Sequence, residues 1–210
     1  MIAVSTKPAA GDALTGRSKW WGFPDLPESL DWPSVPVNDD GDEYDDPLTF
    51  ICQIRCEELA HLDPEGLLPH TGMLWFFASL DYFLGNLDAV CPGMGEWEYP
   101  YFRVLYSNDL DSLHEHTLLY DDGTPAVLPA EAIHFSRVSR DEDSYTRLLG
   151  LPFYEEVSGE LPGLLSLLQL DEDDRWGLRF FDSGMLNFMI LPEDLAARRF
   201  SAVRAWLHSA

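Results

Sequence analysis

Carboxylates are the side chains whose number and spacing in this sequence could do chemistry. The chain holds 37 Asp and Glu residues against 13 Lys and Arg residues, which gives a formal net charge of −24 at pH 7. The acids are densest in residues 38–46, NDDGDEYDD, where no basic residue accompanies them. Carboxylates can bind cations, transfer protons in pairs, or attract a basic protein. Because acids lie close together throughout the chain, their spacing alone singles out no catalytic pair.

The acidic run at residues 171–174 does not match a calcium-binding loop. An EF-hand counted from the first of these residues needs an acid at position 5 and Gly at position 6, where Arg175 and Trp176 stand. We therefore expect a turn between strands. His114 and His116 could share one face of a strand and hold a metal ion, but the acidic residues before them favour a loop. No metal site and no cofactor is predicted.

Motifs of the known reaction types are missing from the sequence. There is no Gly-x-Ser-x-Gly nucleophile elbow, no phosphate-binding Walker A loop and no GxGxxG motif behind an expected strand. Cys52 lies in an apolar stretch, where a thiol is expected to be inert. The sequence therefore predicts no catalytic residue and favours a protein that is not an enzyme.

Cysteine usage and hydropathy favour a cytoplasmic protein. Cys52, Cys56 and Cys91 cannot all pair within the chain, and the spacing of the first two differs from that of a zinc finger. We expect three reduced thiols and no disulfide. The first residues, MIAVSTKPAAGDALTGRSK, lack the long apolar run of a secretory signal, and no apolar run is long enough to cross a membrane.

The net charge predicts the kind of partner. Nucleic acids and anionic membranes are bound through Lys and Arg, so a charge of −24 disfavours both and favours a basic protein. Surfaces that decide specificity tend to lie on loops rather than on buried strands. We therefore expect the partner to bind acids of two segments, residues 38–46 and 107–122. The predicted partner-binding residues are Asp39, Asp40, Asp42, Glu43, Asp45, Asp46, Asp109, Asp111, Asp121 and Asp122.

An internal repeat indicates the elements that must position these acids. Gly72–Phe76 reads GMLWF and Gly184–Phe188 reads GMLNF, and each follows an apolar run with a single Gln, which is Gln53 or Gln169. Two related strand–connection–strand units are therefore expected, packed as pseudo-symmetric halves around a shared core. A Gln inside a buried strand must find partners for its amide. We expect each Gln either to satisfy the backbone of a neighbouring loop or to contact a ligand.

Short apolar runs predict the individual elements. The expected strands are residues 48–54, 73–80, 102–106, 130–140, 164–170, 184–190 and 201–209. Short helices are expected at residues 56–62 and 193–200. Residues 1–17 are expected to form a loose lead-in, and the segments 38–46 and 81–100 to form loops. The two halves would span about residues 18–110 and 145–210.

At the repeat and around it the sequence resembles the YwqG-like family, a domain of unknown function (number 1963). The resembling blocks are Ser18–Pro24, Pro47–Ile54, Leu68–Phe77, Leu167–Asp174, Gly184–Phe188 and Glu193–Phe200. They cover most of the chain in order, although Trp20-Trp21 and residues 81–145 depart from the family pattern. The resemblance implies a single domain over residues 18–210 with an α+β fold, a mostly antiparallel sheet and a few short helices. It implies no reaction and no catalytic residue.

The resemblance also implies a function. Some relatives lie beside bacterial polymorphic toxins, which implies a role as an immunity protein. We therefore expect an acidic protein that neutralises a basic partner, such as a toxin domain of the nuclease or ADP-ribosyltransferase class. The alternatives are a housekeeping ligand-binding or scaffold module of the same fold, and a small-molecule enzyme of unrecognised type.

Overall fold

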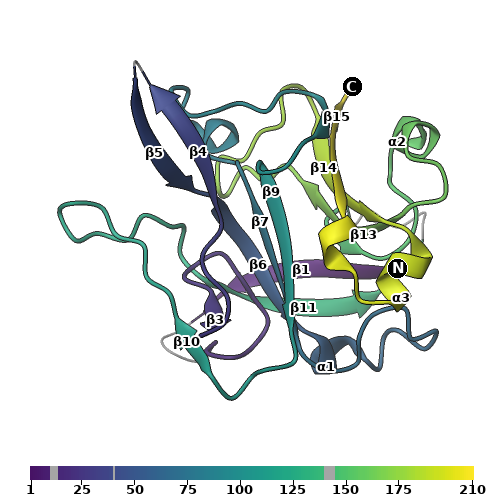
Figure 1. The fold of residues 1–210 in the computed structure, drawn as a ribbon. Coiled ribbons are helices and arrows are strands. Elements are labelled where there is room, and N and C mark those ends of the chain that lie inside the picture. Colours follow the sequence, from purple (N-terminus) through teal and green to yellow (C-terminus); the bar gives the residue numbers. More distant parts are fainter. Residues whose placement is uncertain (10–13, 40, 140–144) are drawn as a thin grey trace.

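The short apolar runs of the sequence form strands that pair in one large sheet (Figure 1). The computed structural model describes residues 1–9, 14–39, 41–139 and 145–210. Within them the strands are β1 (Ile2–Pro8), β2 (Lys19–Trp20), β3 (Asp25–Pro27), β4 (Ser34–Asp39), β5 (Asp42–Pro47), β6 (Thr49–Arg55), β7 (Met73–Ala78), β8 (Gly95–Trp97), β9 (Phe102–Ser107), β10 (Leu113–Glu115), β11 (Glu131–Arg137), β12 (Arg147–Leu148), β13 (Leu165–Asp171), β14 (Gly184–Ile190) and β15 (Arg204–Ser209). The helices are α1 (Cys56–Leu59), α2 (Glu155–Glu160) and α3 (Pro192–Ala196), with 3₁₀ turns η1 (Tyr82–Leu84) and η2 (Phe200–Ala202).

Eleven of these strands form a single sheet in the order β8-β15-β14-β13-β12-β1-β11-β2-β6-β7-β9. Neighbouring strands in it pair antiparallel. Two small sheets of two strands each lie outside it, namely the hairpin β4–β5 and the pair β3–β10. The expected α+β fold with a mostly antiparallel sheet and a few short helices is therefore confirmed. In the part of the chain that is described, no helix is both long and apolar enough to span a membrane.

The two copies of the repeat make matching strand pairs. In the first half β6 pairs with β7, and the register shifts between Phe50 and Cys52. In the second half β13 pairs with β14, and the register shifts between Ser166 and Leu168. A bulge of this kind adds one residue to a strand and increases its twist. The two halves therefore share the irregularity of the pairing as well as the sequence pattern.

Equivalent residues of the two halves have equivalent strand partners, and one pair of them is in direct contact. Gln53 pairs with a residue of the short strand β2, and Gln169 pairs with a residue of the equally short β12. Phe76 and Phe188 end the two GMLxF copies, and their ring centroids lie 5.4 Å apart in an edge-to-face contact. Every residue of β7 and of β14 is buried. The repeat thus forms the shared core, as expected for two halves packed together.

Two expectations about loops are wrong. The expected loose lead-in at residues 1–17 is wrong for residues 2–8, because they form β1, which lies in the middle of the sheet between β11 and β12. Residues 38–46 do not form a loop, because β4 and β5 pair as a hairpin from Ser34 and Pro47 to its turn. Strand pairing uses backbone groups, so it accepts these polar side chains. The segment 81–100 likewise contains η1 and β8.

The remaining expected strands and helices are confirmed to within a few residues at their ends. Asp40 lies outside the described residues, as does the acidic run at residues 141–143.

A glycine begins each GMLxF copy for a steric reason. Gly72 has a φ of +89°, and a Cβ built there would lie 2.6 Å from the carbonyl oxygen of Ser107. A Cβ on Gly184 would overlap the carbonyl oxygen of Phe180. Both positions therefore exclude a side chain. At Gly72 the close packing and the positive φ both favour glycine, whereas at Gly184 the close packing is the reason.

We predict that Gly184→Ala lowers the free energy of unfolding by about 1–3 kcal/mol, because the added methyl group overpacks a buried site. The matched control is Gly159→Ala in α2, where a new Cβ would have no atom within 4 Å. That change should stabilise the protein slightly, by up to about 1 kcal/mol, since Ala favours helix over Gly. Urea unfolding of the two variants measures both effects, and a Gly184→Ala protein as stable as the control would contradict the packing argument.

Candidate functional site

The first predicted acidic segment forms the hairpin β4–β5, which projects from the sheet (Figure 1). Asp39 pairs with Asp42 beside the turn, and Asp40 lies outside the described residues. The side chains of Asp42, Glu43 and Asp45 are exposed. A projecting hairpin with three exposed carboxylates can reach a partner without any rearrangement of the sheet.

The base of the hairpin differs from its tip. Asp46 is half-buried, and burial, followed by the nearby charge of Asp81, raises the pKa of Asp46. Asp81 accepts a 2.7 Å hydrogen bond from the Thr49 hydroxyl. Of the acids of β5, Asp46 is therefore the least available to a partner.

The second predicted segment, residues 107–122, contains the short strand β10, and tight turns lie on either side of it. Asp109 accepts hydrogen bonds from the backbone and the hydroxyl of Ser112, and the hydroxyl bond lowers the pKa of Asp109. Asp122 accepts equivalent bonds from Thr124, which lower its pKa as well. These acids therefore cap turns while keeping their charge at the surface. All the predicted acids of this segment are exposed: Asp109, Asp111, Asp121 and Asp122.

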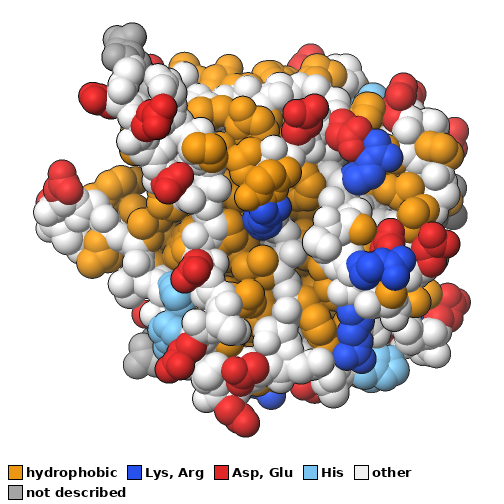
Figure 2. All heavy atoms as spheres, in the orientation of Figure 1, with side chains coloured by type: hydrophobic (Ala, Val, Ile, Leu, Met, Phe, Trp, Pro, Cys, Tyr) orange, Lys and Arg blue, Asp and Glu red, His pale blue; other side chains and the backbone are white. Residues whose placement is uncertain are grey.

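The structure brings part of the second acidic segment to the same side of the molecule as the hairpin. Val35 and Val37 of the hairpin pack in the same small hydrophobic cluster as Leu110 and Leu113 of the second segment. In Figure 1 the hairpin and the loop that follows β10 both project at the left, and Figure 2 shows acidic side chains on both projections. We call the hairpin and the loop that carries Asp121 and Asp122 the composite acidic face. Asp109 and Asp111 lie apart from it, because they follow Ser107, which is paired at the end of the sheet opposite to the hairpin.

Exposed apolar side chains accompany the acids on this face. Tyr44 of β5 is 51% exposed, and Leu119 and Tyr120 are 52% and 63% exposed. Tyr44 and Tyr120 each lie next to an acidic residue in the sequence, and Leu119 precedes Tyr120. Tyrosine is enriched at protein interfaces because it combines a large apolar ring with a hydrogen-bonding hydroxyl. The sequence prediction named the acids of this face but did not name these apolar side chains.

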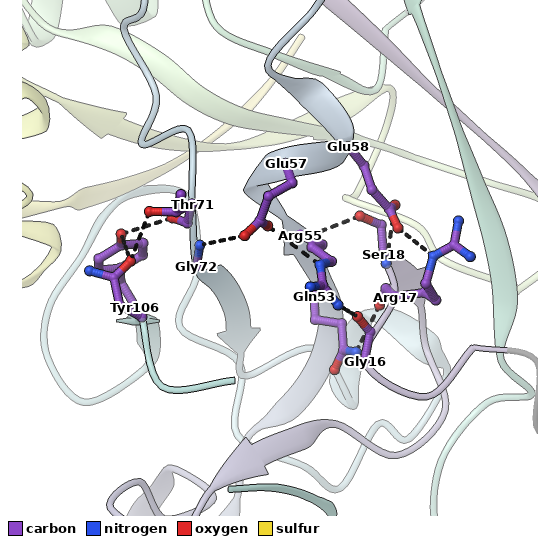
Figure 3. Close-up of polar contacts among 11 residues, drawn as sticks. Gly16, Arg17, Ser18, Gln53, Arg55, Glu57, Glu58, Thr71, Gly72 and Tyr106 are labelled. Carbon is purple, nitrogen blue, oxygen red and sulfur yellow. Dashed lines mark hydrogen bonds and ion pairs between the residues drawn. The ribbon is translucent and has the colours of Figure 1, made fainter. Parts of the chain in front are cut away.

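A second polar group lies inside the protein and was not predicted from the sequence. Lys19 Nζ lies 3.0 Å from Asp25 Oδ2, and both side chains are almost completely buried. Gln53 Nε2 donates 2.6 Å and 2.8 Å hydrogen bonds to that same oxygen and to the backbone of Arg17, and its Oε1 accepts from the amide of Asp25 at 2.8 Å. Figure 3 shows Gln53 of β6 pointing toward residues 16–18. The buried amide thus holds both ends of the segment around β2.

The second half repeats this arrangement without an acid. Gln169 accepts a 2.7 Å hydrogen bond from the amide of Phe153 and donates one to the carbonyl oxygen of Tyr145. Both Gln side chains therefore satisfy loop backbone, which confirms the structural interpretation of Gln53 and Gln169. Phe153 accordingly occupies the place that Asp25 has in the first half.

The other acidic and histidine groups do not converge. His114 and His116 stack with ring centroids 4.3 Å apart. The described residues contain no group of three or more His, Cys, Asp or Glu side chains that could hold a metal ion. The acidic run at residues 171–174 forms the expected turn between β13 and β14, where Asp173 pairs with Arg175 at 2.7 Å.

A family model for a domain of unknown function, DUF1963, matches residues 18–208 of the chain. The matched region contains both halves of the repeat, the acidic hairpin and the buried Lys19–Asp25 pair. The central strand β1 lies before it. No curated protein matches the chain.

Cysteine reactivity gives a test of the core. Cys52 and Cys56 are buried and Cys91 is exposed, and all three are free thiols. Burial raises the pKa of Cys52, and it raises the pKa of Cys56 to about 12. Because the thiolate is the nucleophile, iodoacetamide at about pH 8 should alkylate only Cys91 in the native protein and all three thiols after denaturation. Mass spectrometry of the peptides measures this, and native labelling of Cys52 would show that β6 is accessible.

The pH dependence of stability gives a second test. Burial, together with the charges of Glu172 and Asp173, raises the pKa of Asp171 from 3.8 to about 6. The folded state therefore binds this proton more tightly than the unfolded state, so ionisation of Asp171 costs stability as the pH rises through that window. We predict that Asp171→Asn raises the urea midpoint above pH 6 and that the gain disappears near pH 4.

The control for this test is Asp182→Asn, which removes an exposed carboxylate from the same connection between β13 and β14. It should give no gain that depends on pH over this window. If the two variants behave alike at every pH, burial does not destabilise the ionised form of Asp171.

Proposed function

We propose that this chain, which belongs to the DUF1963 family of domains of unknown function, is an acidic binding protein that neutralises a basic protein partner. The observation that carries the proposal is the composite acidic face. Two projecting segments there each combine exposed carboxylates with exposed apolar side chains. This combination fits protein recognition better than solubility alone, because solubility needs the charge but not the exposed rings.

The electrostatics of the chain support the same role. A net charge of −24 creates a field that steers a basic partner toward the surface and raises the rate of association. Carboxylates at the rim of an interface act mainly on that rate. The exposed rings of Tyr44 and Tyr120 would then supply the contact that loses water and slows dissociation.

The more specific role that we propose is that of an immunity protein in the cytoplasm. The resemblance to the YwqG-like family supports it, since some of those proteins lie beside polymorphic toxins. A nuclease or ADP-ribosyltransferase binds substrates that carry phosphate and can use a basic cleft to do so. An acidic hairpin that enters such a cleft would exclude the substrate by occupying its site, so inhibition would need no catalytic residue.

The test compares two variants that remove the same charge. In the hairpin variant, Asp42→Asn, Glu43→Gln and Asp45→Asn are combined. In the control variant, Glu156→Gln, Glu160→Gln and Glu193→Gln remove three exposed acids from α2 and α3, which lie away from the hairpin in Figure 1. Tagged wild-type protein is used to capture partners from its host, and bound proteins are quantified by mass spectrometry.

We predict a basic protein that is captured by the wild type and by the control variant, and at least about tenfold less by the hairpin variant. Capture should also fall with salt, since the Debye length decreases from about 10 Å at 0.1 M to about 3 Å at 1 M. A Tyr44→Ala variant should weaken capture without changing this salt dependence. Equal loss in the hairpin and control variants would show that net charge acts without a defined face, and capture of no basic protein would refute the proposal.

A further inference from the structure

A pocket of about 480 Å³ opens next to the buried Lys19–Asp25 pair. This volume lies within the range of small-molecule sites in proteins, about 300–1,000 Å³. The walls are mainly apolar and come from the chain before β3 and from the segment that leads to β11: Leu14, Phe23, Pro125, Val127, Leu128 and Pro129. Two charged residues also line it. They are Lys19, which is only 3% exposed, and Glu115, which is exposed.

The ammonium of Lys19 has hydrogen-bonding capacity that the protein does not use. It carries three N–H donors, and among the described residues Asp25 Oδ2 is its one ion-pair partner. Asp25 Oδ1 is fully buried and has no hydrogen-bond partner among those residues. Asp25 itself does not line the pocket, but Lys19 does. Buried polar groups are nearly always satisfied, so the unused N–H donors of Lys19 indicate a bound molecule.

In the second half of the chain, other residues occupy the places of Lys19 and Asp25. Arg147 lies opposite Gln169 as Lys19 lies opposite Gln53, and there the place of Asp25 is taken by Phe153. The same Gln-to-backbone bonds form in both halves. A buried ion pair is by itself weak evidence for stability, because desolvation offsets the attraction. The Gln-to-backbone bonds therefore form without an acid at the place of Asp25, so these shared bonds do not by themselves explain the acid of the first half.

The charges of the pocket define the class of ligand. Lys19 and Asp25 neutralise each other, so Glu115 supplies the remaining charge of the lining. In a protein of net charge −24, that arrangement disfavours an anion and favours an amine. The N–H groups of Lys19 would bind an uncharged carbonyl oxygen, Glu115 would bind the amine, and the apolar walls would bury a hydrocarbon group.

We infer that this pocket binds a small amine that carries a carbonyl oxygen and an apolar side group. This is the chemistry of an amide of an apolar amino acid, and equally of the first residue of a peptide. The inference does not rest on the proposed function, because none of the ten predicted partner-binding acids lines the pocket, although Glu115 lies within the second segment.

The experiment titrates the full chain with L-leucinamide and with the peptide Leu-Gly-Gly, and it follows backbone amide signals by NMR. At millimolar concentration, the signals of Thr15, Gly22 and Val127 should shift. 4-Methylpentanamide, which lacks the amine, and 3-methylbutylamine, which lacks the carbonyl, should each bind at least about tenfold more weakly than L-leucinamide. Tighter binding of the tripeptide would assign the site to a peptide terminus, and tighter binding of L-leucinamide would assign it to a free small amide.

Variants locate the site. Lys19→Met and Glu115→Gln should each weaken binding about tenfold, and Glu160→Gln in α2 should leave it unchanged. Val127→Trp fills the pocket but leaves the ion pair intact, so it tests the site even if Lys19→Met fails to fold. If the three signals do not shift, or if binding survives in Val127→Trp, the inference is wrong. Equal binding of 4-methylpentanamide would also overturn the assignment of an amine to Glu115.

Discussion

One buried Gln amide holds together each half of the sheet, and the rest of the structure depends on these two links. Gln53 and Gln169 each bond to the backbone before and after a strand of only two residues, β2 or β12. Those short strands connect β6 and β13 to the central pair β1–β11. Such short strands have few ladder bonds of their own. A buried amide that loses its hydrogen bonds costs free energy. The bonds of Gln53 and Gln169 therefore hold β2 and β12 in their places between the central strands and the two halves.

The acidic residues lie where repulsion between their charges does little to destabilise the large sheet. The hairpin β4–β5 carries exposed carboxylates away from the sheet, and among the acids of β5 only Asp46, at the base, is partly buried. Asp109 and Asp122 are stabilised as anions by bonds within their own turns. The charge is therefore concentrated on segments that can meet a partner, while the strands that hold the core stay apolar.

The two halves have diverged where one of them borders a pocket. In the first half, Trp75 donates a 2.9 Å hydrogen bond to the backbone of Asp25, whereas Asn187 holds the matching place in the second half. The ion pair of Lys19 with Asp25 follows the same pattern, because the second half has an aromatic residue in place of the acid. The two copies of the repeat share one backbone arrangement. Positions at which their side chains differ are therefore positions that the fold leaves free to vary.

The sequence by itself determined the paired strands of the repeat. Apolar runs and the two GMLxF copies predicted β6, β7, β13 and β14, because the side chains that bury a strand are local in the chain. It also determined which residues carry the charge. The tertiary structure alone decided that β1, which is apolar only at Ile2–Val4, is central in the sheet and that the acidic segment forms the hairpin β4–β5. Strands that pair through backbone groups need no apolar side-chain pattern, so the sequence did not indicate them. It alone brought together Lys19, Asp25 and Gln53, because their contact depends on how distant segments pack.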